Sequence, residues 1–110
     1  MKKENFFHYK LFPAAGEETF ETLIQSRGFK VERIVSSGHA DAEGEWYDQD
    51  HDEWVMLIGG EAVLMFQEGG TFRLSSGDYL FIPAHKKHKV LSTSKEPPCV
   101  WLAIHGKPAE

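Results

Sequence analysis

The sequence predicts an all-β protein, built as an antiparallel sandwich or barrel, and three observations support this prediction. Short alternating or apolar segments recur at intervals of about eight to twelve residues. Glycine- and proline-containing turns separate these segments. No strand–helix–strand pattern occurs between them, so a parallel sheet is not expected. The length of 110 residues suits a single domain, 1–110, with a barrel core over about 29–105.

The N-terminal part of the chain fits two patterns. In residues 17–26, Phe20, Leu23 and Ile24 would share one face of a helix, yet the same segment also fits strand alternation. Both possibilities stay open at this point. We expect the whole segment 1–28 to lie outside the barrel core and to pack on, or swap with, a partner subunit.

Seven strands are predicted after this segment, because each run is short, rich in β-branched or aromatic residues and closed by a turn. Their ranges are 30–36, 54–58, 61–67, 71–74, 79–82, 89–93 and 99–105. Gly59-Gly60 is expected to form a tight hairpin turn, since glycine adopts positive φ at little cost. Pro83 and the pair Pro97-Pro98 interrupt the later strands, because proline cannot donate a ladder hydrogen bond.

The composition excludes several classes of protein. A net charge of −5 leaves no general basic surface for nucleic acid, and the run Lys86–Lys89 is too short to provide one. No apolar stretch reaches the length of a membrane span or a secretory leader, so we expect a cytoplasmic protein without membrane partners. The single Cys99 cannot form a disulfide within the chain and is expected to be a buried strand residue.

Strand alternation predicts a pocket. If residues 47–57 are extended, every second side chain points to one face, which is polar at first and then apolar. That face carries Tyr47, Gln49, His51, Glu53, Val55 and Leu57. The opposite face carries Trp54, Met56 and Ile58, which is too apolar for solvent. We therefore expect the second face to be buried against another sheet or a second subunit, and a homodimer to result.

Two motifs resemble those of the cupin superfamily. Gly77 to Pro83, followed by His88, resembles the second cupin motif, and Glu53 to Gly60 resembles the latter half of the first. The chain is also similar to a group of small bacterial cupins, through Trp46-Tyr47-Asp48-Gln49 and Ile82-Pro83-Ala84-His85. The resemblance covers about residues 46–92 and implies a jelly-roll barrel, also called a double-stranded β-helix.

The same resemblance implies a metal site, with departures. Glu53 and His88 match the positions of cupin metal ligands. Tyr47 and Gln49 stand where metal-binding cupins carry a His-x-His pair, and His85 stands where a glycine is expected. The barrel inference is unaffected by these departures, whereas the inference of a strong metal site is weakened.

The candidate residues suit a divalent transition metal, namely Mn, Fe, Ni or Zn. A carboxylate from Glu53 and an imidazole from His88 are ligands that these ions accept, and Gln49 would add a carbonyl oxygen. His51 or His85 would complete the set. Because an imidazole must be neutral to ligate, metal binding is expected to depend on pH.

The residues also suit chemistry and binding without a metal. Glu53 in an apolar-walled pocket would act in acid–base catalysis, with Tyr47 as the second catalytic candidate. Trp46 and Tyr47 would stack on a sugar or an aromatic ligand, and His85 would contact it. The alternative for each aromatic residue is a place in the core.

The sequence is compatible with three functions. The first is a metal-dependent small-molecule cupin, as a binder or as an enzyme of isomerase, lyase or dioxygenase type. The second is a metal-free module that binds a sugar or an acid without catalysis. The third is a structural module whose pocket is incidental. The fold alone does not choose among them.

Overall fold

A computed structural model describes residues 1–41 and 43–107, and this part of the chain contains eight β-strands and no helix. It therefore contains no helix that could cross a membrane. The strands are β1 (Glu18–Ser26), β2 (Phe29–Ser36), β3 (Asp52–Gly59), β4 (Ala62–Phe66), β5 (Gly70–Leu74), β6 (Tyr79–Ile82), β7 (His88–Thr93) and β8 (Cys99–Gly106). The all-β prediction is confirmed, and each of the seven predicted strands is present with ends that differ by at most a residue or two.

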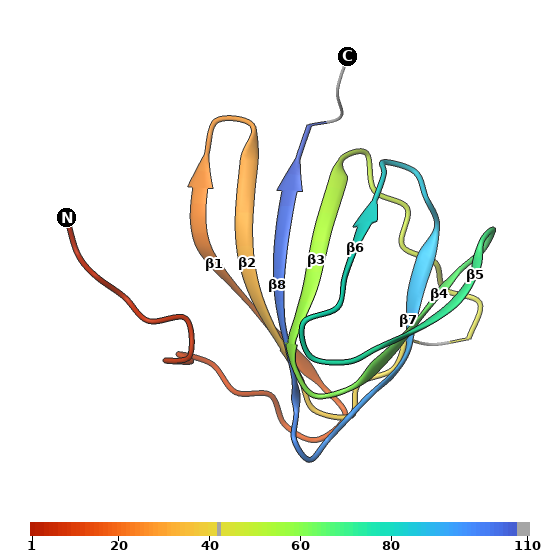
Figure 1. Ribbon diagram of the computed structural model, residues 1–110, viewed down its shortest axis with the longest axis horizontal. Coiled ribbons are helices and arrows are strands. Elements are labelled where there is room, and N and C mark those ends of the chain that lie inside the picture. The colour runs from red at the N-terminus through yellow and green to blue at the C-terminus, as the bar shows by residue number, and fades with distance from the viewer. Residues whose placement is uncertain (42, 108–110) are drawn as a thin grey trace.

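The strands form two antiparallel sheets that face each other (Figure 1). One sheet has five strands in the order β1-β2-β8-β3-β6, and the other has three in the order β5-β4-β7. The described residues also form two isolated backbone bridges: Tyr47, in the segment before β3, pairs with His88 of β7, and Lys95 pairs with Pro98. The predicted jelly-roll architecture is thus present as two facing sheets that are not closed into a continuous hydrogen-bonded barrel.

Residues 18–26, for which helix and strand had both remained open, form strand β1. This strand pairs with β2, and the register shifts between Thr22 and Ile24. A bulge of this kind adds a residue and changes which side chains share a face. The segment is therefore a bulged strand, and the helical alternative is excluded.

The hydrophobic core lies between the sheets. Leu57 on β3 and Ala103 on β8 are fully buried, and they pack with Leu64 and Phe66 of β4. Cys99 is also fully buried, and its Sγ donates to the Glu61 carbonyl oxygen at 2.9 Å. The prediction of a buried strand cysteine is confirmed.

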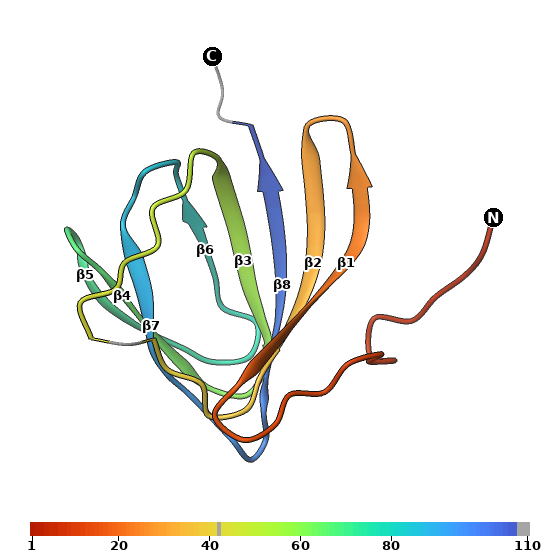
Figure 2. The ribbon, with the colours of Figure 1, turned by 180° about the vertical axis from the view of Figure 1, so that it is seen from behind.

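The segment that precedes β1 lies outside the two sheets, beside β1 and β2 (Figure 2). Arg33 of β2 holds it there, because its guanidinium donates to the Phe6 carbonyl oxygen and lies over the rings of Phe6 and Tyr9 at 5.6 and 5.4 Å. Glu21 of β1 pairs with the same guanidinium and accepts the backbone N–H of Leu11 at 3.0 Å. This arm therefore packs on the outer face of its own sheet, and its exchange with a partner stays a prediction.

The other part of the outer sheet face is apolar and open. Tyr79 and Phe81 of β6 are 63% and 60% exposed, and Ile104 of β8 is 36% exposed. The rings of Trp54 and Tyr79 lie 5.4 Å apart. Trp54 and its neighbours on this face are half-buried, and the three-stranded sheet lies on the opposite side of β3.

We expect Gly60→Ala to destabilise the fold far more than Gly59→Ala. Gly60 has a φ of +87°, and a Cβ there would lie 2.8 Å from the Pro98 carbonyl oxygen and 2.9 Å from Cys99 Cα. Left-handed backbone costs an alanine about 1–2 kcal/mol, and the overlap adds about 1–3 kcal/mol. A Cβ at Gly59 would meet nothing within 4 Å. Urea unfolding of both variants checks this, and equal losses would contradict it.

Candidate functional site

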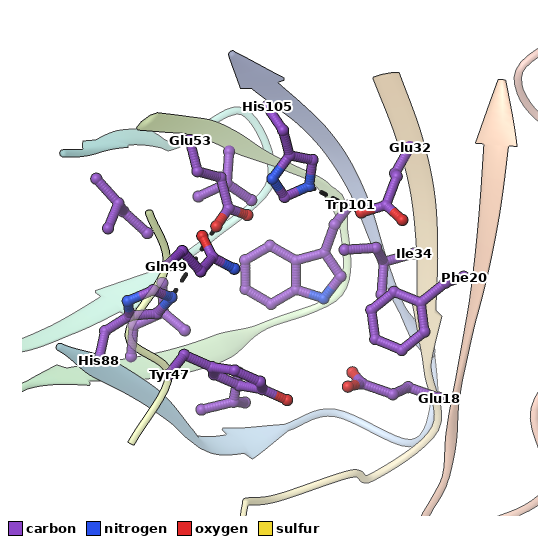
Figure 3. A pocket seen from close by; sticks show the side chains of 14 residues that line it. Glu18, Phe20, Glu32, Ile34, Tyr47, Gln49, Glu53, His88, Trp101 and His105 are labelled. Carbon is purple, nitrogen blue, oxygen red and sulfur yellow. Dashed lines mark hydrogen bonds and ion pairs between the residues drawn. The ribbon is translucent and has the colours of Figure 1, made fainter. Parts of the chain in front are cut away.

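A cavity of about 130 Å³ lies between the two sheets. Figure 3 shows the side chains that line it, which come from every strand except β5 and from the segment before β3. They are Glu18, Phe20, Glu32, Ile34, Tyr47, Gln49, Glu53, Val55, Leu64, Ile82, His88, Val90, Trp101 and His105. The wall is apolar in the middle and polar at both ends.

Glu53 and His88 face each other at one end of this cavity (Figure 3). Glu53 lies near the start of β3 and His88 begins β7, so the two sheets each contribute one of them. Their side chains are buried, at 10% and 8% exposure, and Glu53 Oε1 lies 4.0 Å from His88 Nε2. The structure therefore brings together the two residues that match the cupin ligand positions.

The hydrogen bond on the far side of the His88 ring fixes its tautomer. His88 Nδ1 lies 2.9 Å from the Lys86 carbonyl oxygen, which can only accept, so Nδ1 is the donor. In the neutral ring, Nε2 then carries a lone pair that faces the Glu53 carboxylate. Two acceptors facing each other are suited to share a cation, and an Nδ1–H bound to a carbonyl is common in metal-ligating histidines.

Tyr47 and Gln49 complete the polar side of the cavity. The backbone of Tyr47 pairs with that of His88 in both directions, at 2.8 and 3.2 Å, which places both side chains on the cavity wall. The backbone carbonyl oxygen of Gln49 accepts the backbone N–H of His85 at 2.7 Å, and this bond holds the segment before β3 against the turn before β7. The four positions of the family's ligand pattern are thus gathered, with a phenol and an amide at two of them.

The Tyr47 hydroxyl is a hydrogen-bond donor at neutral pH. Burial, together with the negative charge of Asp41, raises the pKa of Tyr47 to about 12. Its hydroxyl lies 3.4 Å from Asp41 Oδ1. Tyr47 can therefore donate a proton or a hydrogen bond to a ligand, and it would serve poorly as a base.

His51 is not brought to Glu53 and His88. Residues 50 and 51 form a bend before β3 begins, so strand alternation does not extend back through His51. Its Nε2 lies 2.9 Å from Nδ1 of His105, whose Nε2 lies 2.8 Å from Glu32 Oε1. His51 is the outer member of this chain of hydrogen bonds, and only His105 and Glu32 reach the cavity.

His85 and Trp46 also lie outside the cavity wall. The His85 side chain is 70% exposed, and its Nδ1 lies 2.9 Å from Asp48 Oδ1. Its φ of +65° explains why this position of the motif favours glycine. The Trp46 ring lies under the Lys89 ammonium, 4.6 Å from its centroid. Neither residue contacts the cavity in this structure.

Few ionisable side chains that could bind a metal lie at the end of the cavity that contains Glu53 and His88. In the described ranges, no group of three or more His, Cys, Asp or Glu side chains gathers as a metal site. Glu53 and His88 are two such donors, and Gln49 adds an uncharged amide oxygen. Two ionisable side chains and one uncharged amide oxygen are therefore the donors that the lining gathers at this side.

Sequence reasoning missed several acidic, aromatic and imidazole side chains of the cavity wall. Glu18, Glu32, Trp101 and His105 were not candidates, although all four line it. Strand β8 pairs with β3 so that Glu53 lies opposite His105, and Leu57 lies opposite Trp101. Alternation within 99–105 places Trp101 and His105 on one face, but only the pairing of β8 with β3 shows that this face is the cavity.

Several solved structures of bacterial proteins share this fold over nearly the whole chain. A crystal structure from Ralstonia eutropha JMP134, called a "putative mannose-6-phosphate isomerase", is 38% identical, with a TM-score of 0.89 over 97% of this chain and 99% of that one. A protein of Thermus thermophilus is 18% identical, with a TM-score of 0.79 over 99% and 100%. Ectoine synthase from P. lautus is 19% identical, with a TM-score of 0.72 over 99% and 80%.

The last two likenesses concern the fold alone. No curated protein matches the sequence. The family profile described as "Cupin domain" matches residues 34–105, which include β3, β7, Glu53 and His88. Both motifs identified in the sequence lie within this match. The chain belongs to the cupin family.

Proposed function

We propose that the chain binds a small organic molecule in the cavity, next to a divalent transition metal held by Glu53, His88 and Gln49. One observation carries the proposal: a buried carboxylate and the lone pair of a buried imidazole face each other 4.0 Å apart. Leaving these two buried groups facing without a shared proton or cation is unfavourable.

The spacing fits a shared ion. Carboxylate oxygen and imidazole nitrogen bind such ions at about 2.0–2.2 Å, so two donors on one ion are at most about 4.2 Å apart. The separation of 4.0 Å is within this limit for donors on nearly opposite sides of an ion, and tetrahedral binding would bring the two side chains closer, to about 3.4 Å. The Gln49 amide oxygen supplies a weaker third donor from the same wall. A metal bound there would polarise an oxygen of the ligand as a Lewis acid.

Calorimetric titration of the untagged, metal-stripped protein with Mn²⁺, Fe²⁺, Ni²⁺ and Zn²⁺ tests the proposal. We expect binding of one ion per chain for at least one metal, with affinity that falls as pH drops and His88 becomes protonated. Absence of binding for all four ions at neutral pH would refute the metal part of the proposal.

A metal-free binding module is the second candidate, and the number of ionisable donors favours it. Within the described ranges only two such donors meet at the polar side, fewer than a strong metal site provides. In that case Glu53 would accept, and Tyr47 would donate, hydrogen bonds to the ligand. Ligand binding that persists in the metal-stripped protein would support this candidate.

The name of the Ralstonia neighbour suggests an isomerase acting on a sugar phosphate. The cavity itself gives this reading limited support, since its lining within the described residues contains three glutamates and no lysine or arginine. A phosphate group usually requires cationic donors. We therefore propose small-molecule binding, with catalysis of isomerase, lyase or dioxygenase type as its extension, and do not include the phosphate.

We also propose that the chain forms a homodimer through the apolar outer face of β3, β6 and β8. Tyr79, Phe81 and Ile104 form an exposed apolar surface there, which a second copy would cover. Sedimentation equilibrium should give twice the chain mass of 12.5 kDa, and Phe81→Glu should shift it to the monomer. A wild-type monomer at high concentration would contradict this. The lone cysteine, which cannot form a disulfide within the chain, fits a reducing compartment, and we propose the cytoplasm.

A further inference from the structure

The cavity has a second polar end, which the proposed metal ligands do not use. Figure 3 shows the Glu18 carboxylate and the Phe20 ring on the side away from Glu53 and His88, with the Tyr47 hydroxyl pointing toward Glu18. Glu18 and Phe20 come from β1, in the same sheet as Trp101 of β8. We call Glu18, Phe20, Tyr47 and Trp101 the Glu18 end of the cavity.

The charge at the Glu18 end is negative. Glu18 Oε2 accepts from Ser36 Oγ at 3.0 Å, and Oε1 lies 3.4 Å from His39 Nε2. That same imidazole nitrogen lies nearer to Asp41, at 3.1 Å. One imidazole is thus shared by two carboxylates, so the group keeps a net negative charge even when His39 is protonated.

No basic side chain of the described lining offsets this charge. The lining carries three carboxylates and two imidazoles, and Lys30, which is not part of the lining, contacts Glu32 at 3.4 Å. A metal at Glu53 and His88 would neutralise the opposite end only. An anionic group placed beside Glu18 would therefore be repelled.

Aromatic faces surround the carboxylate. Phe20 is 51% exposed and Tyr47 is 42% exposed, so both rings offer accessible surface at the cavity. Trp101 forms the wall between the two polar ends (Figure 3). Aromatic rings attract organic cations through their negative faces, by about 0.5–2 kcal/mol each. Aromatic rings next to a carboxylate therefore favour binding of a positively charged organic ammonium group at this end of the cavity.

We propose that the Glu18 end binds an organic cation, an alkylammonium or quaternary ammonium group of the pocket's ligand. The inference rests on the proposed function, in which this cavity binds a small organic molecule. Partial burial also raises the pKa of Glu18, through lost hydration that contacts with His39 and Ser36 only partly offset. A bound cation would replace that lost hydration and favour the ionised carboxylate.

Choline and 3,3-dimethyl-1-butanol form a matched probe pair, because they differ only in the charged nitrogen. We expect choline to bind the wild-type protein at least about 10-fold more tightly than the neutral analogue in calorimetric or NMR titrations. Inorganic phosphate should not bind at the Glu18 end. Equal affinity for the two probes, or no choline binding, would overturn the proposal.

Two variants locate the binding. Glu18→Gln should weaken choline binding by about 10-fold or more, whereas Glu17→Gln, which removes an equal charge from an exposed neighbour, should not. Phe20→Leu should weaken choline binding several-fold and leave 3,3-dimethyl-1-butanol unaffected, and Phe20 is exposed enough for that variant to fold. Unchanged choline affinity in folded Glu18→Gln would refute the site.

The same samples separate this inference from the proposed function. Metal titration of the wild-type protein measures metal binding at the Glu53–His88 end, and it does not depend on choline. If metal or neutral ligands bind but choline does not, only the cation inference fails. If neither metals nor any probe binds, the proposed function fails with it.

Discussion

Arg33→Ala should lower the free energy of unfolding by about 3–5 kcal/mol, because it leaves a buried carboxylate without its partner. The Arg33 and Glu21 side chains are 3% and 9% exposed, and they form a close ion pair on the outer face of β1 and β2. The substitution also removes the donor to the Phe6 carbonyl oxygen. The N-terminal arm should therefore detach as the sheet loses stability.

Urea unfolding checks the size of this effect, and Arg27→Ala is the matched control. Arg27 is exposed in the turn between β1 and β2, so its removal should change stability by about 0.5 kcal/mol or less. Limited proteolysis of Arg33→Ala should also cleave the arm faster than in the wild type. A loss below about 1 kcal/mol would show that Arg33 and Glu21 are not a buried pair.

The pH dependence of stability offers an independent test of the same pair. Burial acts to raise the pKa of Glu21, but hydrogen bonds from Arg33 and the Leu11 N–H outweigh it and lower the pKa below 4.5. A lowered folded-state pKa means that Glu21 stabilises the fold above its unfolded value, near pH 4.5, and that this contribution disappears as pH falls through the folded value. Glu21→Gln should remove this acid-side loss.

Local sequence signals were sufficient for most of the fold. Gly60 and the paired Gly69-Gly70 lie at turns with positive φ, which only glycine adopts readily, and this fixes where strands end. The alternation from Glu53 to Leu57 correctly separated the inner face from the outer one, since Glu53, Val55 and Leu57 are buried. The two residues that alternate with them, Trp54 and Met56, are half-buried. These features depend on neighbours in sequence and need no knowledge of strand pairing.

The cavity depends on pairing that the sequence does not reveal. His51 was assigned to the inner face by extending alternation across residues 50 and 51, where the chain bends. Glu18 and Trp101 reach the cavity because β1, β2 and β8 join the sheet of β3, an order that skips along the chain. The family motifs identified Glu53 and His88, but motif matching says nothing about residues contributed by the other strands.

Removing either ionisable ligand should reduce metal affinity by at least about 100-fold, which corresponds to about 2.7 kcal/mol. Glu53→Gln keeps the shape of the side chain but removes its charge, and His88→Gln removes the imidazole lone pair that faces it. Changes one step removed from a metal typically cost 10–100-fold, so loss of a direct ligand should cost more. Calorimetric titration with the metal that binds the wild type most tightly measures the loss.

The variant Gln49→His separates a true metal site from a pair of polar residues that happen to face each other. An imidazole at this position would add a third ionisable donor to the wall that holds Glu53 and His88, so affinity should rise by at least about 10-fold. His51→Ala is the control, because His51 is bonded to His105 and lies off the cavity wall, and it should leave affinity unchanged. If Gln49→His fails to strengthen binding while His51→Ala abolishes it, the metal is held elsewhere, on the side of His51 and His105.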